Sequence, residues 1–314
     1  MKIYNGIEEY NCNKVPIPVV SVGTFDGVHI GHQRIIARMV EEAHKINGET
    51  VLITFYPHPR LVLHSDSRDL KFINTREKKL ELLERFGIQH LIAINFTREF
   101  AKTTSSDFIK NIIVDKIKTK KLIVGYDHQF GKNRLGDYSS LYDICKELSI
   151  EVKRVKAQDV NKIFVSSTKI RKALNEGKIK KANELLGYNY SISGNVVRGA
   201  GIGRTIGYPT ANIDLEDEYK LITANGVYAC LVEYKDKTYK GMGNIGFRPT
   251  IDHGDLTIEV NIFDFNKEIY DESLKVFFVD RIRDEEKFKN LDALKKQLKK
   301  DKINVLKLLK REVL

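Results

Sequence analysis

The stretch SVGTFDGVHIGHQRII, residues 21–36, joins a buried apolar run to a segment of helical period. The apolar run at 19–25 predicts a strand buried on both faces, and the spacing of apolar residues over 32–46 predicts a helix. A strand that leads directly into a helix is the opening unit of a parallel α/β sheet. Two of the chain's 8 histidines, His29 and His32, lie at this junction.

The same alternation continues through the first half of the chain. Further buried strands are predicted at 50–55, 90–96, 121–125 and 151–155, and helices at 75–86, 106–117 and 139–148. Strands that alternate with helices form a parallel, doubly wound sheet with right-handed crossovers. We therefore expect a Rossmann-like α/β fold in this half.

The pattern changes near residue 188. Two short helices are predicted at 167–175 and 179–186, and after them the chain turns to short strands separated by glycine turns, which indicate a small antiparallel sheet or barrel. These strands are predicted at 189–198, 226–234, 238–244, 257–265 and 274–281. A Lys-rich amphipathic helix over about 284–310 closes the chain. We expect two domains, 1–187 and 188–314.

Composition limits the class of protein. The 314 residues include 53 Lys and Arg against 42 Asp and Glu, a net charge of +11. This charge favours polyanionic ligands such as nucleotides or nucleic acid, although a proteome rich in lysine explains it equally well. The cysteines Cys12, Cys145 and Cys230 lie far apart, which fits a reducing compartment and neither a disulfide framework nor a cysteine zinc site. A polar start and the lack of an apolar run of roughly 18–20 residues predict a cytoplasmic protein with no membrane partner.

The junction at His29 and His32 has the features of a phosphate site. Ligands of open parallel α/β sheets bind beyond the carboxyl ends of the strands, where a helix N-terminus offers free N–H groups and a positive dipole end. Both imidazoles share one helix face, and Gly31 lets a purine or ribose approach the backbone. The alternative is a pair of surface histidines at a helix start. Three preceding residues favour the phosphate interpretation: Gly23, Asp26 and Gly27.

The residues His-Ile-Gly-His resemble the H-x-G-H signature of nucleotidyltransferases, which transfer an adenylyl group by positioning and charge neutralisation. Such a site needs a second phosphate-contacting element late in the same domain. In VSSTKIRKAL, residues 165–174, the hydroxyls of Ser166, Ser167 and Thr168 lie at a predicted helix start, with Arg171 on the same face. A serine that caps an amphipathic helix is equally common as a purely structural pattern.

Two loops follow predicted strands at the same sheet edge as the histidines. YPHPR (56–60) contains Pro57, His58 and Pro59, and VGYDHQFGKNRLGD (124–137) contains Asp127 and Phe130. Loops of this kind suit stacking against a planar ligand. Ordinary turn chemistry explains either loop alone.

A glycine-rich stretch, GNVVRGAGIGRTIGYPTANI at 194–213, marks the second half. Its glycines predict a loop that brings backbone N–H groups against phosphates, and it is not a Walker A loop because no G-K-[ST] follows. Thr210 and Asn212 then offer hard oxygen ligands that suit Mg²⁺ held jointly with ATP phosphates. Glu259, in the predicted strand at 257–265, suits a general base for a hydroxyl, while the strand pattern alone favours a solvent-facing residue.

Taken together, the motifs resemble the bacterial bifunctional riboflavin kinase/FMN adenylyltransferases, also called FAD synthetases. They occur in the family's order from end to end: GTFDGVHIGH, FYPHP, VGYDHQFG, SSTKIR, YSISGNVVRGAGIGRTIGYPTANI, NGVYA, NIGFRPT and EVNIFDF. The resemblance implies an N-terminal domain that transfers AMP from ATP to FMN and releases pyrophosphate. It also implies a C-terminal six-stranded barrel that phosphorylates the ribityl 5′-hydroxyl of riboflavin.

The resemblance also assigns roles to residues. In the adenylyltransferase, it implies that His29, His32 and Arg171 are catalytic, that Gly23, Phe25, Gly31, Ser166, Ser167 and Thr168 bind the nucleotide, and that Pro57, His58, Pro59, Asp127 and Phe130 bind the flavin. In the kinase, it implies a phosphate loop of Gly199, Gly201, Gly203, Arg204 and Pro209, Mg²⁺–ATP bound by Thr210 and Asn212, and Glu259 as the base. One departure is Asp127-His128, where many relatives have Asn-Phe.

Two other interpretations stay open. A basic α/β domain joined to a barrel also suits an RNA-binding protein, which would expose aromatic residues between Lys and Arg along the barrel strands. An enzyme with one inactive half is the nearer alternative, although both motif sets are present. The sequence leaves open the oligomeric state and the transfer of FMN between the sites.

Overall fold

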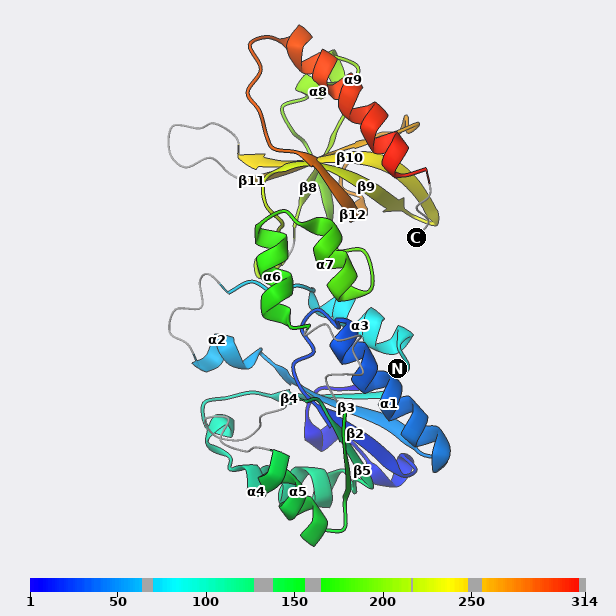
Figure 1. Ribbon diagram of the computed structural model, residues 1–314, viewed down its shortest axis with the longest axis vertical. Helices are drawn as coiled ribbons and strands as arrows, with labels where there is room; N and C mark the ends of the chain where they lie inside the picture. The colour runs from blue at the N-terminus through cyan, green and yellow to red at the C-terminus, as the bar shows by residue number, and fades with distance from the viewer. Residues whose placement is uncertain (64–69, 127–137, 156–164, 216, 248–255, 311–314) are drawn as a thin grey trace. The chain divides into compact units, whose positions relative to one another are not determined.

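The computed structural model describes residues 1–63, 70–126, 138–155, 165–215, 217–247 and 256–310. The chain divides into two compact units, Met1–Ser166 and Ser167–Leu314 (Figure 1). In the described part of the chain, none of the helices combines the length and the apolar character that crossing a bilayer requires.

A six-stranded parallel sheet forms the centre of the first unit. Its strand order is β1-β4-β3-β2-β5-β6, and every neighbouring pair is parallel. The strands are β1 (Lys2–Tyr4), β2 (Pro18–Val22), β3 (Glu49–Tyr56), β4 (His90–Asn95), β5 (Lys121–Val124) and β6 (Glu151–Arg154). The predicted doubly wound parallel sheet is confirmed. The edge strand β1 was not predicted, because three residues that are mostly exposed carry no readable pattern.

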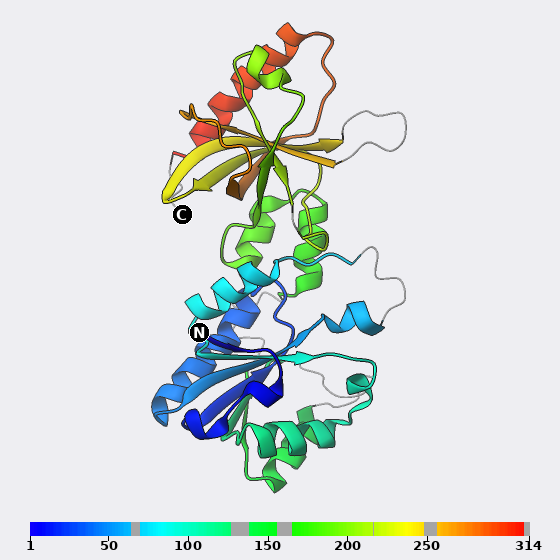
Figure 2. The same ribbon diagram turned by 180° about the vertical axis from the view of Figure 1, so that it is seen from behind.

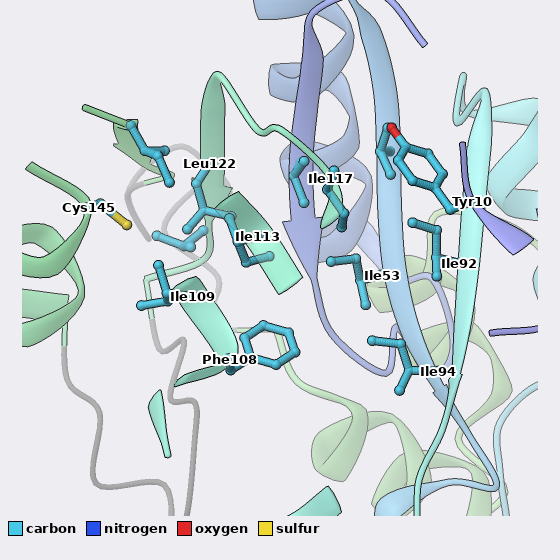
Figure 3. Close-up of a cluster of buried hydrophobic side chains, with 14 of the residues drawn as sticks. Tyr10, Ile53, Ile92, Ile94, Phe108, Ile109, Ile113, Ile117, Leu122 and Cys145 are labelled. Atoms are coloured by element: carbon cyan, nitrogen blue, oxygen red, sulfur yellow. The ribbon is translucent and has the colours of Figure 1, made fainter. Parts of the chain in front are cut away.

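Helices cover both faces of this sheet, as expected for buried parallel strands. They are η1 (Ile7–Glu9), η2 (Cys12–Lys14), α1 (Ile30–Lys45), α2 (Pro59–Leu63), α3 (Arg76–Arg85), η3 (Phe100–Lys102), α4 (Ser105–Asp107), the π-helical η4 (Phe108–Lys116) and α5 (Tyr138–Glu147). On one face, Ile109 and Ile113 of η4 and Cys145 of α5 pack against Ile53 and Leu122 of the sheet (Figure 3). This buried layer fixes the strands whose carboxyl ends carry the predicted site.

The helix α1 begins two residues before its predicted start at residue 32 and ends at Lys45. His29 is its N-cap residue, and the ring Nδ1 of His29 accepts a hydrogen bond from the backbone nitrogen of His32 at 3.4 Å. An imidazole in this role takes the place of the usual Ser, Thr, Asp or Asn cap. The sequence pattern missed the true start because histidine is not a preferred capping residue.

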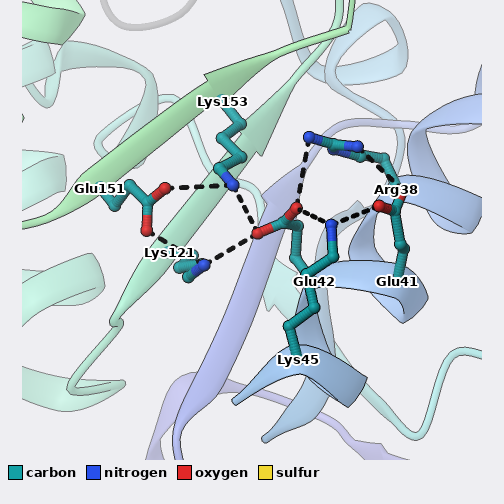
Figure 4. A network of polar contacts seen from close by, with 7 residues as sticks. All are labelled: Arg38, Glu41, Glu42, Lys45, Lys121, Glu151 and Lys153. Atoms are coloured by element: carbon teal, nitrogen blue, oxygen red, sulfur yellow. Dashed lines mark hydrogen bonds and ion pairs between the residues drawn. The ribbon is translucent and has the colours of Figure 1, made fainter.

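A buried carboxylate links the helix α1 to the strands β5 and β6 of the sheet. The Glu42 side chain of α1 is fully buried and accepts hydrogen bonds from Lys153 of β6 at 2.6 Å and Lys121 of β5 at 2.8 Å (Figure 4). Arg38 and Lys45 of α1 approach the other carboxylate oxygen at 3.2 and 3.1 Å. Burial raises the pKa of Glu42, but the hydrogen bonds from these lysines outweigh it and lower the pKa to about 2.

A closed antiparallel barrel forms the centre of the second unit, with strand order β10-β11-β8-β7-β12-β9. Its strands are β7 (Ser191–Val197), β8 (Ala211–Asp214), β9 (Gly226–Tyr234), β10 (Lys237–Phe247), β11 (Leu256–Ile262) and β12 (Ser273–Arg283). The predicted six-stranded barrel is confirmed. Spacing alone predicted five strands, because β8 is four residues long and follows directly on the glycine-rich stretch.

The terminal helix α9 (Leu291–Leu308) lies against β9, β10 and β12 (Figure 2). The helix buries its residue Val305 in this contact. It begins seven residues later than the predicted start at 284, because the side chain of Asn290 caps it by accepting from the nitrogen of Ala293 at 2.9 Å. Arg283 of β12 donates to the buried carboxylate of Asp301 through Nε and Nη2, at 3.0 and 2.9 Å. This two-point contact fixes α9 on the barrel.

Two further helices, α6 (Ser167–Asn175) and α7 (Ile179–Leu186), belong to the second unit. The carbonyl oxygen of Leu174 accepts from the nitrogen of Ala224 at 3.0 Å and from the hydroxyl of Thr223 at 2.8 Å. Asn183 of α7 donates to the carbonyl oxygen of Phe278 at 2.9 Å. The boundary between the two catalytic domains, expected between 187 and 188, stays a prediction.

Candidate active sites

The His29 imidazole is buried at the start of α1, with 6% of its surface exposed. Because its Nδ1 accepts the capping hydrogen bond, the neutral ring carries its proton on Nε2. The ring stacks on that of His32, with centroids 3.6 Å apart and planes at 14°. An ideal Cβ at Gly31 would lie 3.2 Å from the His29 ring, so Gly31 leaves room for this stack.

His32 lies between two rings. His29 stacks on one side, and the ring of Phe25 lies 4.7 Å away from centroid to centroid. Burial, His29 and then Lys79 hold the pKa of His32 well below its ordinary value. Its Nδ1 atom is buried and, in the part of the chain that the structure describes, meets no hydrogen-bond partner. Both rings are therefore neutral imidazoles, each with one N–H to donate rather than a positive charge. Their predicted contact with phosphate stays a prediction.

The turn before the pair is held in an unusual conformation. Phe25 and Val28 have positive φ angles of 49° and 33°, a region that non-glycine residues rarely adopt. The buried carboxylate of Asp26 accepts from the backbone nitrogen of Ile73 at 3.0 Å. Behind the turn, Lys79 of α3 donates to the carbonyl oxygen of Thr24 at 3.5 Å. Strained backbone fixed from two sides is typical of sites that hold a ligand.

The predicted flavin loops are partly described. Pro57 and His58 follow β3, Pro59 begins α2, and the His58 ring lies 4.7 Å from that of Phe72. Asp127 and Phe130 lie outside the described residues.

One arginine lies at the ends of the second loop. The guanidinium of Arg154 lies 4.6 Å from the ring of Tyr126 and 4.8 Å from that of Tyr138. Arg154 was not predicted as a site residue, and it contacts the residue before and the residue after the range 127–137.

The second predicted phosphate element is α6. Ser167 begins this helix, Thr168 is exposed within it, and Arg171 follows three residues later. Ser166 is the last residue of the first unit, and the other three belong to the second. Their predicted contact with the phosphates of ATP stays a prediction.

The predicted kinase residues come together on one side of the barrel. Asn212 of β8 and Glu259 of β11 are paired residues of neighbouring antiparallel strands. The hydroxyl of Thr210 donates to Oε2 of Glu259 at 3.2 Å. Glu259 is therefore not a freely solvated strand residue, because its carboxylate is held beside a hydroxyl and an amide.

The glycine-rich stretch folds around these side chains. An ideal Cβ at Gly199 would lie 2.2 Å from Nδ2 of Asn212, so a side chain at 199 would displace the amide. Residues 202–205 form a short helical turn, α8 (Ile202–Thr205), which begins after Gly201 with its positive φ of 73°. Arg204 in this turn donates to Glu268 at 3.2 Å. At least one of the glycines thus serves close packing around a predicted metal ligand, which the sequence analysis attributed to phosphate binding alone.

Two asparagines were missed. Asn244 of β10 is directly opposite Glu259 across the β10–β11 pair, and Asn261 lies two residues beyond Glu259 on β11. Residues opposite each other in a strand pair share a face, as do residues two apart in one strand. The alternation in β11 places Asn261 beside Glu259, but the register that brings in Asn244 cannot be read from one sequence.

The donor set fits a magnesium ion. Thr210 and Asn212 offer a hydroxyl and an amide oxygen beside the carboxylate of Glu259, and Mg²⁺ prefers such hard oxygens together with substrate phosphates. Among the described residues, no three His, Cys, Asp or Glu side chains gather as a metal centre. A cation here would therefore depend on oxygens of the nucleotide as well.

Comparison with known proteins covers both units. The FAD synthetase family matches residues 14–169, and the riboflavin kinase family matches residues 186–309. The bifunctional riboflavin kinase/FMN adenylyltransferase of Buchnera aphidicola (from Schizaphis graminum) is 38% identical over 96% of both chains. The chain belongs to this family.

Other relatives show the same extent of similarity. The bifunctional riboflavin kinase/FMN adenylyltransferases of Listeria monocytogenes and Escherichia coli K12 are 36% and 33% identical, over 90% and 96% of both chains. A crystal structure from Streptococcus pneumoniae, described as a macrolide-efflux protein, is 34% identical with a TM-score of 0.87, and the match covers 96% of this chain and 97% of that one. The similarity to this family therefore covers both halves of the chain.

Proposed function

We propose that this chain makes flavin cofactors in two steps. The second unit phosphorylates riboflavin with ATP to give FMN, and a site at the His29–His32 pair then transfers AMP from a second ATP to FMN, giving FAD and pyrophosphate. The observation that carries the proposal is that the relatives match both halves of the chain, and that the two halves match two different enzyme families, FAD synthetase and riboflavin kinase. ATP is the co-substrate of both steps, and riboflavin, FMN and FAD are the other small-molecule partners.

In the kinase step, Glu259 is the general base. Its carboxylate takes the proton of the ribityl 5′-hydroxyl as that oxygen bonds to the γ-phosphorus of ATP and the bond to ADP breaks. The hydroxyl of Thr210 donates to Oε2 of Glu259 and so orients the carboxylate. Thr210 and Asn212 would hold Mg²⁺, which neutralises charge on the transferred phosphoryl group when bound.

In the adenylyltransferase step, catalysis depends on positioning of the two reactants and on hydrogen bonds to the phosphates. An oxygen of the FMN phosphate bonds to the α-phosphorus of ATP, and the bond to pyrophosphate breaks. Nε2 of His29, which carries the proton of the neutral ring, donates to the phosphates as charge develops on the leaving group. His32 acts beside it. Ser166, Ser167, Thr168 and Arg171 stay predicted nucleotide-binding residues of this step.

The proposal places the enzyme in the cytoplasm. Cys12, Cys145 and Cys230 are free thiols in the structure, which agrees with a reducing compartment. The alternative of an RNA-binding barrel predicts a series of exposed aromatic residues along the barrel strands. Among the described strand residues, Phe247 is exposed, whereas Tyr228, Tyr234, Phe277 and Phe278 are buried.

One assay tests the proposal. Purified protein is incubated with riboflavin, ATP and Mg²⁺, and the flavins are separated over time. We expect FMN first and FAD after it, with two ATP consumed for each FAD. A reaction without FMN would refute the kinase assignment, and FMN that is never converted to FAD would refute the adenylyltransferase assignment.

A further inference from the structure

Asn261 has no part in the kinase step described above, although it is 7% exposed beside the general base. It lies two residues after Glu259 on β11, so both side chains are on the same face of the strand. Nδ2 of Asn261 donates to the backbone carbonyl oxygen of Pro209 at 2.6 Å. A carbonyl oxygen only accepts, so the amide must present its N–H to Pro209.

This hydrogen bond acts on the peptide unit that carries Thr210. The carbonyl of Pro209 and the nitrogen of Thr210 belong to one planar peptide group, so fixing the carbonyl limits rotation directly before Thr210. The Thr210 hydroxyl then reaches Glu259 at 3.2 Å. The strand β11 thus holds the Pro209–Thr210 turn at two points. Asn261 binds the backbone carbonyl of Pro209, and Glu259 binds the side-chain hydroxyl of Thr210.

The glycine-rich stretch before this turn is folded on itself. The nitrogen of Tyr208 donates to the carbonyl oxygen of Gly203 at 2.8 Å. An ideal Cβ at Gly203 would lie 2.2 Å from the carbonyl oxygen of Tyr208, so the two segments touch through their backbones. Asn261 therefore binds the end of this folded loop, at Pro209, to the strand β11, which carries Glu259.

We propose that Asn261 is a positioning residue for the kinase reaction. Its amide fixes the Pro209–Thr210 peptide, and this keeps Thr210 and Glu259 in place around the nucleotide phosphates. Asn261 acts through Thr210 and does not touch the reacting atoms. The inference rests on the proposed kinase function of this site.

Three variants of the full chain separate positioning from general stability. Asn261→Asp keeps the shape of the side chain but replaces the N–H donor with an oxygen that repels the Pro209 carbonyl. Asn261→His restores a donor, because Nδ1 of a histidine branches from Cγ as Nδ2 of an asparagine does. Thr223→Val is the matched control: it removes another buried side-chain donor to a carbonyl, the 2.8 Å bond to Leu174 of the same unit.

Two measurements are made on each variant, with thermal melting alongside. Calorimetry gives the affinity for ADP with and without Mg²⁺, and FMN formation gives kcat and the KM for ATP. We expect Asn261→Asp to weaken Mg²⁺-dependent ADP binding and to raise the KM for ATP by about 5- to 30-fold, the effect of losing one buried hydrogen bond. Asn261→His should restore both, and Thr223→Val should lower only the melting temperature.

The inference is overturned if Asn261→Asp binds ADP and ATP as the wild type does, or if Thr223→Val loses as much affinity. If Asn261→Asp does not fold, Asn261→Ala takes its place under the same criteria. Failure of the proposed function shows itself differently, because the wild-type chain would then form no FMN at all.

Discussion

The ring of His32 stacks on the ring of His29 at 3.6 Å, while the backbone of His32 donates to Nδ1 of His29. His29 therefore caps the helix α1 through Nδ1, and its other ring nitrogen, Nε2, is left as the hydrogen-bond donor. The capping bond fixes the tautomer of His29, and burial keeps the pKa of His32 low. In the proposed adenylyltransferase site, two neutral donors at a helix N-terminus would bind phosphate oxygens without a protonated histidine.

The first prediction concerns the loss of either histidine. His29→Ala or His32→Ala should slow adenylyl transfer by ~10²–10³, the usual effect of removing one preorganised donor. Kinase activity should persist, because Glu259 and Thr210 belong to the other unit. FAD formation from supplied FMN and FMN formation from riboflavin are measured separately, with melting as the folding control. Near-normal FAD synthesis in both variants would show that the pair is structural.

The second prediction concerns pH. A histidine whose pKa is lowered in the folded state takes up a proton on unfolding once the pH is below about 6.5. The free energy of unfolding should therefore fall as the pH drops through that value, and His32 should contribute to the slope. His32→Gln cannot titrate and should give a flatter profile between about pH 7.5 and 5.5. Lys79 and Asp26 also face this region and are unchanged in the comparison. Parallel profiles for wild type and variant would contradict the assignment.

The third prediction concerns the buried carboxylate of Glu42. Glu42→Gln leaves Lys121 and Lys153 without their buried counter-charge and should lower the free energy of unfolding by about 3 kcal/mol. Because the folded-state pKa is about 2, the contribution of Glu42 is complete above about pH 4.5 and is lost as the pH falls toward 2.

Glu41→Gln is the matched control for Glu42→Gln. Glu41 contacts Arg38 and Lys45 of the same helix, but half of its side chain is exposed, so its removal should cost much less stability than removal of Glu42. Urea unfolding of both variants at neutral pH gives the comparison. Equal losses would show that burial of Glu42 carries no special weight.

How much of this could be read from the sequence depends on the range of each interaction. The alternation at 19–46 gave β2 and α1 because buried parallel strands and amphipathic helices have local signatures. Assigning Thr210 and Glu259, 49 residues apart, to one site needed the resemblance to a family, and their hydrogen bond came only from the structure, since strand register is not a local property.

Other residues had a role that could not be read from the sequence. Asn261 reads as one polar position in an alternating strand, and only the 2.6 Å bond to Pro209 gives it a role. Likewise, nothing in the sequence distinguishes Gly199 from the neighbouring glycines. Only the structure shows that the side chain of Asn212 packs against it.

The fourth prediction concerns the base of the kinase. Glu259→Gln keeps the shape of the side chain and still accepts from Thr210, but it cannot take a proton from the 5′-hydroxyl. FMN formation should fall by about 10²- to 10⁴-fold, the range typical of a general base. FAD formation from supplied FMN should remain, which also shows that the variant is folded. An undiminished kinase rate would mean that another group, or the nucleotide itself, takes the proton.

The last prediction concerns where the kinase can be separated. A fragment that begins at Tyr188 contains the whole barrel and should form FMN but no FAD. A fragment that begins at Ser167 keeps α6 and α7, whose contacts include the bonds from Thr223 to Leu174 and from Asn183 to Phe278. It should therefore melt at a higher temperature than the shorter one, with the same kinase rate when both are folded. A shorter fragment that is folded but forms no FMN would show that the kinase needs these helices and that the boundary at 187 is wrong. Equal melting temperatures would mean that α6 and α7 add nothing to the stability of the barrel, despite their hydrogen bonds to it.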